Sequence, residues 1–246
     1  MAGEEFVVIK ALFCDFYGTV VLEDDEPINT IIEHIYKYGN GNAHRKSEIG
    51  TYWWQRFSTL CADSYGDNFR MQRELEIQSL LETLERFDIK EDAVKLCEPQ
   101  FEYWKAPLIF SDSKLFFSKC FLPIYIVSNI DTADLNSALK YNGLETAGIV
   151  TSEEARAYKP RQEIFNLALS KFGLKPNEVI HMGDSITSDV MGAKAAGIQS
   201  IWINRKGKPN PLCPCIQSAD LINVLTTHVT RDTTKHENCS ATHKSW

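Results

Sequence analysis

The feature that most constrains this chain is the alternation of apolar runs with helix-like segments between residues 121 and 203. Strand-like runs occupy residues 121–127, 148–150, 179–182 and 200–203, and helical patterns occupy 131–142, 160–172 and the stretch up to 196. Gly143, Gly173 and Gly197 stand where these helices should end. Strands and helices that alternate at this spacing predict a parallel sheet covered by helices on both faces.

The chain before residue 121 shows two other patterns. An apolar run over residues 7–13 predicts one more strand, which leads directly into Asp15. From about residue 27 to residue 104 the apolar residues recur at helical spacing, as in Ile28, Ile31 and Ile35. The sequence therefore predicts an all-helical insert between the first strand and the second.

Charge and composition narrow the classes of partner. The chain has 246 residues, 26 Lys and Arg against 33 Asp and Glu, a net charge of −7 and no long basic run. Nucleic acid and an anionic membrane are therefore not expected partners, and a small anionic substrate would need local positive groups. Glu4 and Glu5 precede an apolar run too short to cross a bilayer, and the segment does not resemble a signal peptide. We expect a cytoplasmic protein, either a monomer or a homodimer.

The seven cysteines form an odd set without regular spacing, which favours reduced thiols packed as small apolar residues. A zinc site at Cys213 and Cys215, with His236 and Cys239, is a weak alternative because one residue between ligands is not the usual spacing. The residues beyond 228 lack a core pattern, and we expect the tail at 229–246 to be mobile.

Polar side chains follow the predicted strands at the edge where a parallel sheet of this kind binds ligands. Carboxylates there are the hard oxygen ligands that Mg²⁺ uses, and Asp15 could instead attack a substrate and carry a covalent intermediate. A hydroxyl just before a helix can donate to an anionic oxygen, and a lysine can neutralise charge. The candidates are Asp15, Thr19, Ser128, Asn129, Lys159, Asp184, Ser185 and Asp189.

These segments carry a resemblance. Asp15-Phe16-Tyr17-Gly18-Thr19, Ser128-Asn129, Lys159-Pro160 and the run from Gly183 to Asp189 resemble the four motifs of the haloacid dehalogenase-like hydrolase superfamily, in the same order. The resemblance extends to about Lys208. It implies an α/β fold with a Rossmann-like parallel sheet core flanked by helices (1–20 and 108–228) and an inserted α-helical cap (21–107).

The resemblance also implies roles for the candidate residues. Asp15 matches the nucleophile, Thr19 and Ser128 the residues that bind substrate oxygens, and Lys159 the charge-balancing lysine. Asp184 and Asp189 match the acids beside Mg²⁺. The implied metal set is Asp15, Tyr17, Asp184 and Asp189, and whether Tyr17 contributes only its backbone carbonyl stays open. Asn129 and Tyr17 are placed at the substrate, and His181 is interpreted as a packed strand residue.

Tyr17 departs from the pattern of the superfamily's phosphatases, in which this position is a second Asp that protonates the leaving group. A Tyr there is similar to the haloacid dehalogenases, which displace halide and need neither a metal nor a proton donor. Dehalogenases also carry a cap arginine eight residues before a Trp, and Arg45 stands eight residues before Trp53. Arg45 is thus a candidate for substrate binding, although a solvated loop arginine explains it equally well.

The fourth motif favours the phosphatases instead. Asp184 and Asp189 keep the metal-binding form, and acids gathered near Asp15 would repel one another without a cation or protons. We therefore predict a Mg²⁺-dependent phosphohydrolase that acts on a small phosphorylated metabolite through an aspartyl intermediate. A 2-haloacid dehalogenase and a catalytically weak module that binds an anion and a metal remain as alternatives.

Overall fold

A parallel sheet forms the centre of the molecule. The computed structural model describes residues 8–39, 44–209 and 215–229. Six strands pair in the order β3-β2-β1-β4-β5-β6, and every pair is parallel, which confirms the predicted α/β fold. The strands are β1 (Ala11–Cys14), β2 (Ile124–Ser128), β3 (Gly148–Thr151), β4 (Val179–Gly183), β5 (Gln199–Ile203) and β6 (Ile216–Ser218).

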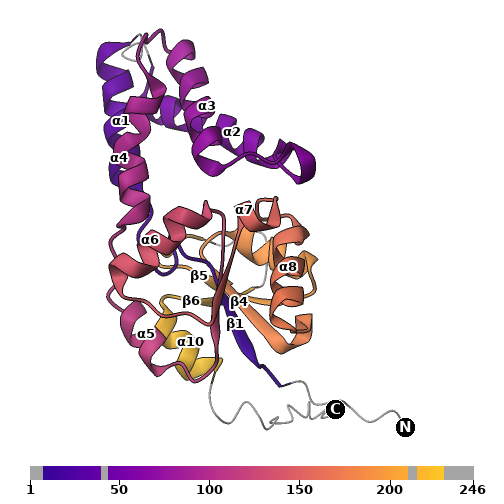
Figure 1. The fold of residues 1–246 in the computed structure, drawn as a ribbon. Helices are drawn as coiled ribbons and strands as arrows, with labels where there is room; N and C mark the ends of the chain where they lie inside the picture. Colours follow the sequence, from indigo (N-terminus) through magenta and orange to yellow (C-terminus); the bar gives the residue numbers. More distant parts are fainter. Residues whose placement is uncertain (1–7, 40–43, 210–214, 230–246) are drawn as a thin grey trace, which may run out of the picture.

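Helices cover both faces of this sheet (Figure 1). All four residues of β1 are buried, and their side chains alternate between the faces. Leu12 and Cys14 belong to one apolar cluster with α5 (Ser113–Lys119), α6 (Thr132–Asn142) and α10 (Leu221–Thr227). Phe13 belongs to a second cluster with α8 (Gln162–Phe172) and α9 (Gly192–Ala195). The core is therefore a three-layer arrangement in which the central strand β1 is buried on both sides.

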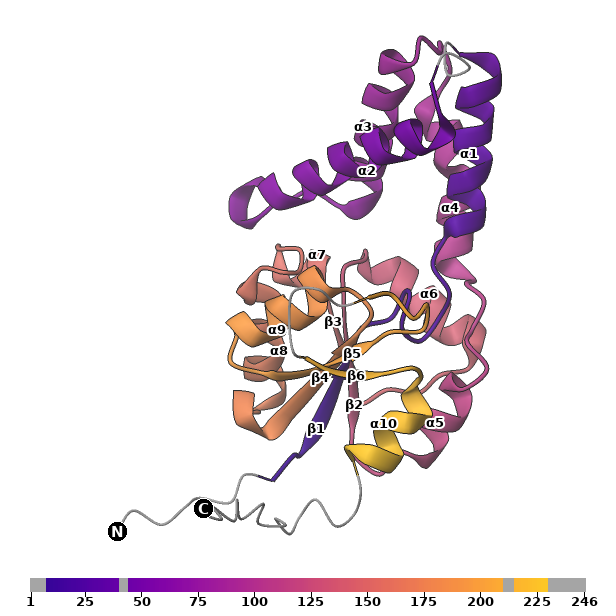
Figure 2. The same cartoon turned by 180° about the vertical axis from the view of Figure 1, so that it is seen from behind.

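The cap consists of helices that the chain forms between β1 and β2. They are α1 (Asp25–Tyr38), α2 (Lys46–Asp63), α3 (Gln72–Arg86) and α4 (Ala93–Lys105), with a short 3-10 turn at Gly66–Asn68. Figures 1 and 2 show them as a separate group above the carboxyl ends of the strands. The two connections to the core run side by side, since the Leu22 N–H donates to the Leu108 carbonyl at 2.7 Å.

Core and cap also touch away from these connections. The carboxylate of Asp131, three residues after Ser128, accepts hydrogen bonds from the backbone N–H groups of Gln72 (2.7 Å) and Arg73 (3.1 Å). The Arg73 guanidinium in turn pairs with Asp134. A core side chain therefore caps the first turn of α3, which holds the cap over the edge where the candidate residues lie.

Several predicted boundaries are wrong in detail. The helix predicted from residue 160 begins at Gln162, because Arg161 is extended and the Lys159 N–H is bound by Asn129. The stretch after Asp184 opens as a π-helical segment (Ile186–Met191) before α9. Helix α5 and strand β6 were not predicted, because each is too short to produce a clear period.

Some sequence expectations fall outside the described residues. These are the start of the first predicted strand at residue 7, three of the four zinc candidates (Cys213, His236 and Cys239), and nearly all of the tail beyond residue 228. In the part of the chain that is described, no helix is both long and apolar enough to cross a membrane.

Candidate active site

The sheet order brings the predicted residues together. Strand β1 lies between β2 and β4, and its last residue, Cys14, is in register with Ile126 and Met182. Asp15, Ser128 and Asp184 come just beyond these paired positions, at the same edge of the sheet. Asp15 therefore occupies the middle of the site, where neighbouring strand ends can reach it from both sides.

Asp15 is buried, with 6% of its surface exposed, and its carboxylate is held by three side chains. Oδ1 accepts hydrogen bonds from Ser128 Oγ at 3.0 Å and from Lys159 Nζ at 2.6 Å. Oδ2 has one long contact, 3.4 Å from Thr19 Oγ1. The four residues predicted to be catalytic thus meet in one cluster, and Oδ2 is the less engaged carboxylate oxygen.

A second set of bonds holds Lys159 in place. Its Nζ also donates to Asp189 Oδ1 at 2.6 Å, and His181 Nε2 lies 2.9 Å from the same oxygen. Asp189 Oδ2 accepts from the Ser185 N–H at 3.0 Å. Asp189 therefore orients the lysine that contacts Asp15, in addition to lying within reach of a metal.

His181 is a residue whose role the sequence interpretation missed. Its side chain is fully buried, as expected of a packed residue, but Nε2 meets the Asp189 carboxylate rather than apolar groups alone. The available signal was a polar ring on a buried strand, eight residues before an acid in the same motif. Such a ring needs a partner, and the partner had to come from a neighbouring turn.

Asn129 supports the site through the main chain. Its Nδ2 donates to the Lys159 carbonyl at 3.1 Å, and its Oδ1 accepts from the Lys159 N–H at 2.7 Å. The side-chain amide thereby fixes the backbone of the lysine. The predicted contact between Asn129 and the substrate stays a prediction, whereas the structure shows this residue as a support for Lys159.

Three acids lie close enough to share one cation. Asp15, Asp184 and Asp189 each offer an oxygen within 4.8 Å of the others. Gly18 makes room for this group, since its φ is +82° and a Cβ there would come within 2.7 Å of Asp184 Oδ1. The donor set of three carboxylates suits Mg²⁺, so the residues present fit the metal that the sequence predicts.

The electrostatics of the acids differ with their partners. Burial raises the pKa of Asp15, more than Lys159 lowers it. Burial alone would raise the pKa of Asp189, but Lys159 and His181 lower it to about 2. Burial, followed by the charges of Asp15 and Asp189, raises the pKa of Asp184 to about 8. Asp184 is therefore the acid whose charge the protein leaves least compensated.

Lys159 is the positive charge in this cluster. Burial would lower its pKa, but Asp15 and Asp189 raise it above its ordinary value. No donor among the described residues hydrogen bonds to the Asp184 carboxylate. One ammonium thus serves two carboxylates, and the third faces the place where a cation would compensate it.

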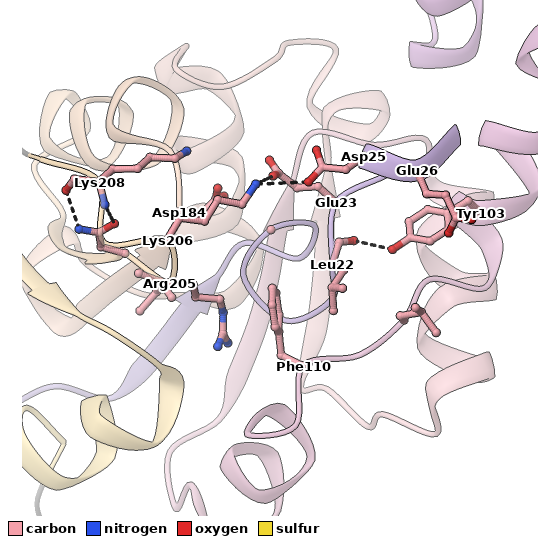
Figure 3. A pocket seen from close by; sticks show the side chains of 14 residues that line it. Leu22, Glu23, Asp25, Glu26, Tyr103, Phe110, Asp184, Arg205, Lys206 and Lys208 are labelled. Atoms are coloured by element: carbon pink, nitrogen blue, oxygen red, sulfur yellow. Dashed lines mark hydrogen bonds and ion pairs between the residues drawn. The ribbon is translucent and has the colours of Figure 1, made fainter. Parts of the chain in front are cut away.

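A cavity of about 300 Å³ opens beside Asp184 and Gly18 (Figure 3). One wall is the connection from core to cap, with Leu22 and Glu23, and the other follows β5, with Arg205 and Lys206. Lys206 crosses between them through ion pairs of 2.8 Å to Glu23 and 3.4 Å to Asp25. The cavity is large enough for a small molecule and borders the acid cluster.

The Tyr17 side chain is turned toward the cap. Its hydroxyl donates to the Trp104 carbonyl, near the end of α4, at 2.5 Å. Burial, followed by the charges of Asp134 and Asp24, raises the pKa of Tyr17 well above its ordinary value. The hydroxyl is thus occupied at the joint between core and cap, and only the backbone of Tyr17 remains for the predicted metal contact.

The structure does not bring Arg45 to the acid cluster. Its side chain is 83% exposed and pairs with Glu48 at 3.1 Å, one turn along α2. The start of α2 lies beside the end of α1, on the side of the cap farthest from the sheet (Figure 1). Trp53, by contrast, is buried and donates to Ser79 Oγ within the cap. The solvated arginine, which the sequence left open, fits this geometry.

Comparisons with known proteins agree with the fold and the site. The sequence model of haloacid dehalogenase-like hydrolases matches residues 9–197. The haloacid dehalogenase-like hydrolase domain-containing protein 3 of Danio rerio is 37% identical over 115 residues, 45% of each chain. The phosphoserine phosphatase of Thermus thermophilus is 36% identical over 79 residues, 31% of this chain and 32% of that protein. The matched region spans less than half the length of these relatives.

A solved structure matches over a longer stretch. The L-2-haloacid dehalogenase of Xanthobacter autotrophicus superposes with a TM-score of 0.69 at 18% identity, over 89% of this chain and 98% of that one. This likeness establishes the shared fold. The curated relatives include both phosphatases and dehalogenases. Since the family model covers most of the chain, this protein belongs to the haloacid dehalogenase-like hydrolases.

Proposed function

We propose that this hydrolase is a Mg²⁺-dependent phosphohydrolase that acts on a small phosphorylated substrate through an aspartyl-phosphate intermediate. The observation that carries the proposal is the uncompensated Asp184 carboxylate, which lies beside Asp15 and Asp189 within 4.8 Å. Dehalogenation needs no cation, whereas three acids served by one lysine suit a site that holds one. The phosphatase among the relatives supports the same assignment.

The residues of the site divide the reaction between them. Asp15 Oδ2 attacks phosphorus, the bond from phosphorus to the leaving oxygen breaks, and that oxygen departs with the electron pair. Ser128 and Lys159 hold Oδ1, so that Oδ2 points outward for attack. Water then attacks the phosphorus of the aspartyl phosphate, the bond from phosphorus to Asp15 Oδ2 breaks, and a water proton passes to solvent. This step releases inorganic phosphate and regenerates the Asp15 carboxylate. A Mg²⁺ ion would be held by the carboxylates of Asp15, Asp184 and Asp189 and by the Tyr17 carbonyl, and would neutralise charge on the phosphoryl oxygens.

The leaving group distinguishes this protein from a phosphatase with a built-in acid. The hydroxyl of Tyr17 donates to Trp104, and the hydroxyls of Thr19 and Ser128 donate to Asp15. Among the described residues, no acidic side chain of the 15–20 loop besides Asp15 itself faces the site. A general acid contributes about 10²- to 10⁴-fold to a rate. We therefore expect substrates whose leaving group departs as a stable anion, such as acyl phosphates, phosphoanhydrides or aryl phosphates.

The direct test is phosphate release from 4-nitrophenyl phosphate and a panel of phosphate esters, with and without Mg²⁺. We expect turnover that EDTA abolishes and Mg²⁺ restores, and a loss of about 10⁴-fold or more in Asp15→Asn. Asp63→Asn, an exposed acid at the end of α2, is the matched control and should retain full activity. Metal-independent turnover, or an active Asp15→Asn protein, would contradict the proposal.

A series of aryl phosphates tests the leaving-group argument. Without a general acid, kcat/KM should fall steeply as the pKa of the released phenol rises. Tyr17→Asp places a carboxyl group at the position and should flatten this dependence, whereas Tyr17→Phe removes only the bond to Trp104 and should keep it steep. A shallow dependence in the wild-type protein would show that another group protonates the leaving oxygen.

Dehalogenation is the second candidate, and the position of Tyr17 favours it. Halide also departs without a proton, and the superposed L-2-haloacid dehalogenase shares the fold. Halide release from 2-haloacids, measured beside the phosphate panel, separates the two reactions. Halide release without phosphate release would overturn the phosphatase proposal. A protein that releases neither halide nor phosphate would instead favour a module that binds an anion and a metal.

A further inference from the structure

Arg205 forms an unusually complete set of contacts just outside the acid cluster. It lies two residues beyond β5, and its side chain is 13% exposed. Nε and Nη2 both donate to the Thr19 carbonyl, at 3.1 and 2.7 Å. Nη1 and Nη2 donate to the two carboxylate oxygens of Asp112, at 2.9 and 3.1 Å. The guanidinium lies 3.9 Å from the centre of the Phe110 ring. Figure 3 labels both side chains at the edge of the cavity.

The Thr19 carbonyl depends on this arginine. Thr19 belongs to the tight turn after β1, in which the N–H groups of Thr19, Val20 and Val21 all donate to the Phe16 carbonyl. These bonds engage the N–H groups of the turn but not the Thr19 carbonyl. Among the described residues, Arg205 is the residue that donates hydrogen bonds to this carbonyl. The far end of the 15–20 loop is therefore fastened by a residue 186 positions away in the sequence.

The same joint connects the loop to two other segments. Asp112 follows the connection that returns from the cap, and its Oδ2 also accepts from the Leu221 N–H at the start of α10, at 2.8 Å. Ser113 Oγ donates to the Val20 carbonyl at 2.7 Å. Arg205 thus links the 15–20 loop to the fixed end of the cap connection. A fork of five N–H donors can make these bonds at once, and an ammonium cannot.

We propose that Arg205 is a positioning residue for the reaction, one that holds the Thr19 backbone so that Thr19 Oγ1 and Asp15 Oδ2 keep their places at the substrate. The assignment rests on the proposed function. Arg205 reaches Asp15 only through Thr19, whose hydroxyl lies 3.4 Å from Oδ2. A displacement of about 1 Å in a reacting group can cost on the order of 10²-fold in rate, so a loosened loop should act on turnover.

The test compares variants by kcat and KM with 4-nitrophenyl phosphate and Mg²⁺. Arg205→Lys keeps the charge but loses the fork, and kcat should fall about 10-fold with KM within about 3-fold of the wild-type value. In Arg205→Ala, kcat should fall about 100-fold. Guanidinium ion, but not urea, should restore part of that loss by binding in place of the missing side chain.

Two controls separate positioning from general stability. Asp112→Asn weakens the same joint but leaves the donation to Thr19, so it should lower Tm while kcat stays within about 3-fold. Lys194→Ala removes an exposed cation on α9, outside the lining of the cavity, and should change neither quantity. Equal losses of kcat in Arg205→Lys and Asp112→Asn, or an unchanged kcat in a folded Arg205→Lys protein, would overturn the positioning role alone. An inactive wild-type protein would overturn the proposed function as well.

Discussion

Two groups of acids in this molecule, one in the core and one in the cap, have opposite surroundings. At the strand ends, Asp15 and Asp189 share the Lys159 ammonium, with 2.6 Å between Nζ and each carboxylate. In the cap, the half-buried Asp24 accepts hydrogen bonds from neutral donors, Gln100 at 2.8 Å and Trp104 at 2.7 Å. The buried Glu76 close by is likewise without an ion pair among the described residues.

The pKa values follow this difference. Burial raises the pKa of Glu76 to about 8, with a further increase from the charge of Asp24 and an opposing hydrogen bond from Gln100. Lys159 and His181, in contrast, lower the pKa of Asp189 to about 2 against the effect of burial. Similar burial therefore gives a neutral acid where no cation is supplied and an ionised acid where one is. The same rule holds within the core, where Asp184 lacks a hydrogen bond to Lys159 and its pKa is also raised to about 8.

Lys159→Met should produce the largest change, because it makes the core group resemble the cap group. Asp15 and Asp189 would lose their cation, and we expect unfolding at pH 7 to become easier by about 3–5 kcal/mol. Turnover should fall by about 10²- to 10³-fold. Chemical denaturation and steady-state kinetics measure both effects, with Lys194→Met, a change of an exposed lysine on α9, as the control. A stable and active Lys159→Met protein would show that Asp15 and Asp189 do not need the Lys159 cation.

Glu76→Gln should have an intermediate effect that depends on pH. The folded protein keeps the Glu76 proton up to about pH 8, whereas the unfolded chain releases it near the ordinary value of 4.5. The stability that the neutral acid contributes is therefore complete below about pH 4 and is lost as pH rises through about 8. Gln cannot ionise, so the variant should match the wild-type protein at pH 5 and be more stable at pH 9, by on the order of 3 kcal/mol.

Denaturation curves at pH 5, 7 and 9 measure this effect. Glu82→Gln, on the same helix but paired with Arg56, serves as the control, because its acid has a lowered pKa and should lose stability when neutralised. An equal stability difference between Glu76→Gln and the wild-type protein at all three pH values would show that the cap acid is already ionised.

Arg45→Ala should have the smallest effect. The side chain is exposed and pairs with Glu48 on the same helix, so its removal should leave kcat/KM within about twofold. We expect cations on the surface of the cap to take no part in the reaction. A tenfold loss of turnover toward either a phosphate ester or a 2-haloacid would show that Arg45 reaches the substrate.

Part of the core site could be predicted from sequence because Asp15, Ser128 and Asp184 stand at the end of a strand or directly after it. Asp15, Ser128 and Asp184 needed only the rule that parallel strands end at one edge, and the structure brings them together there. Arg45 shows the limit of this approach. Its spacing to Trp53 matched a pattern, but which way a helix start faces depends on how the helices of the cap pack.

Supporting residues were harder to predict for a physical reason. His181 and Arg205 act through contacts to Asp189 and to the Thr19 carbonyl, and neither contact has a local sequence signal. The sequence interpretation places Tyr17 at the substrate, whereas its hydroxyl bonds to Trp104, 87 positions away. Such pairings exist only after the chain has folded around them.

Periodicity and position after a strand are local properties of the chain. They were therefore enough to predict the parallel sheet, the helical insert and the acids at the strand ends. The contacts that hold these acids in place are seen only in the folded structure. Lys159 serves two acids, Asp131 fastens the cap, and Arg205 fastens the turn after Asp15. These assignments depend on distances between segments far apart in sequence, and those distances are set only when the chain packs into its folded form.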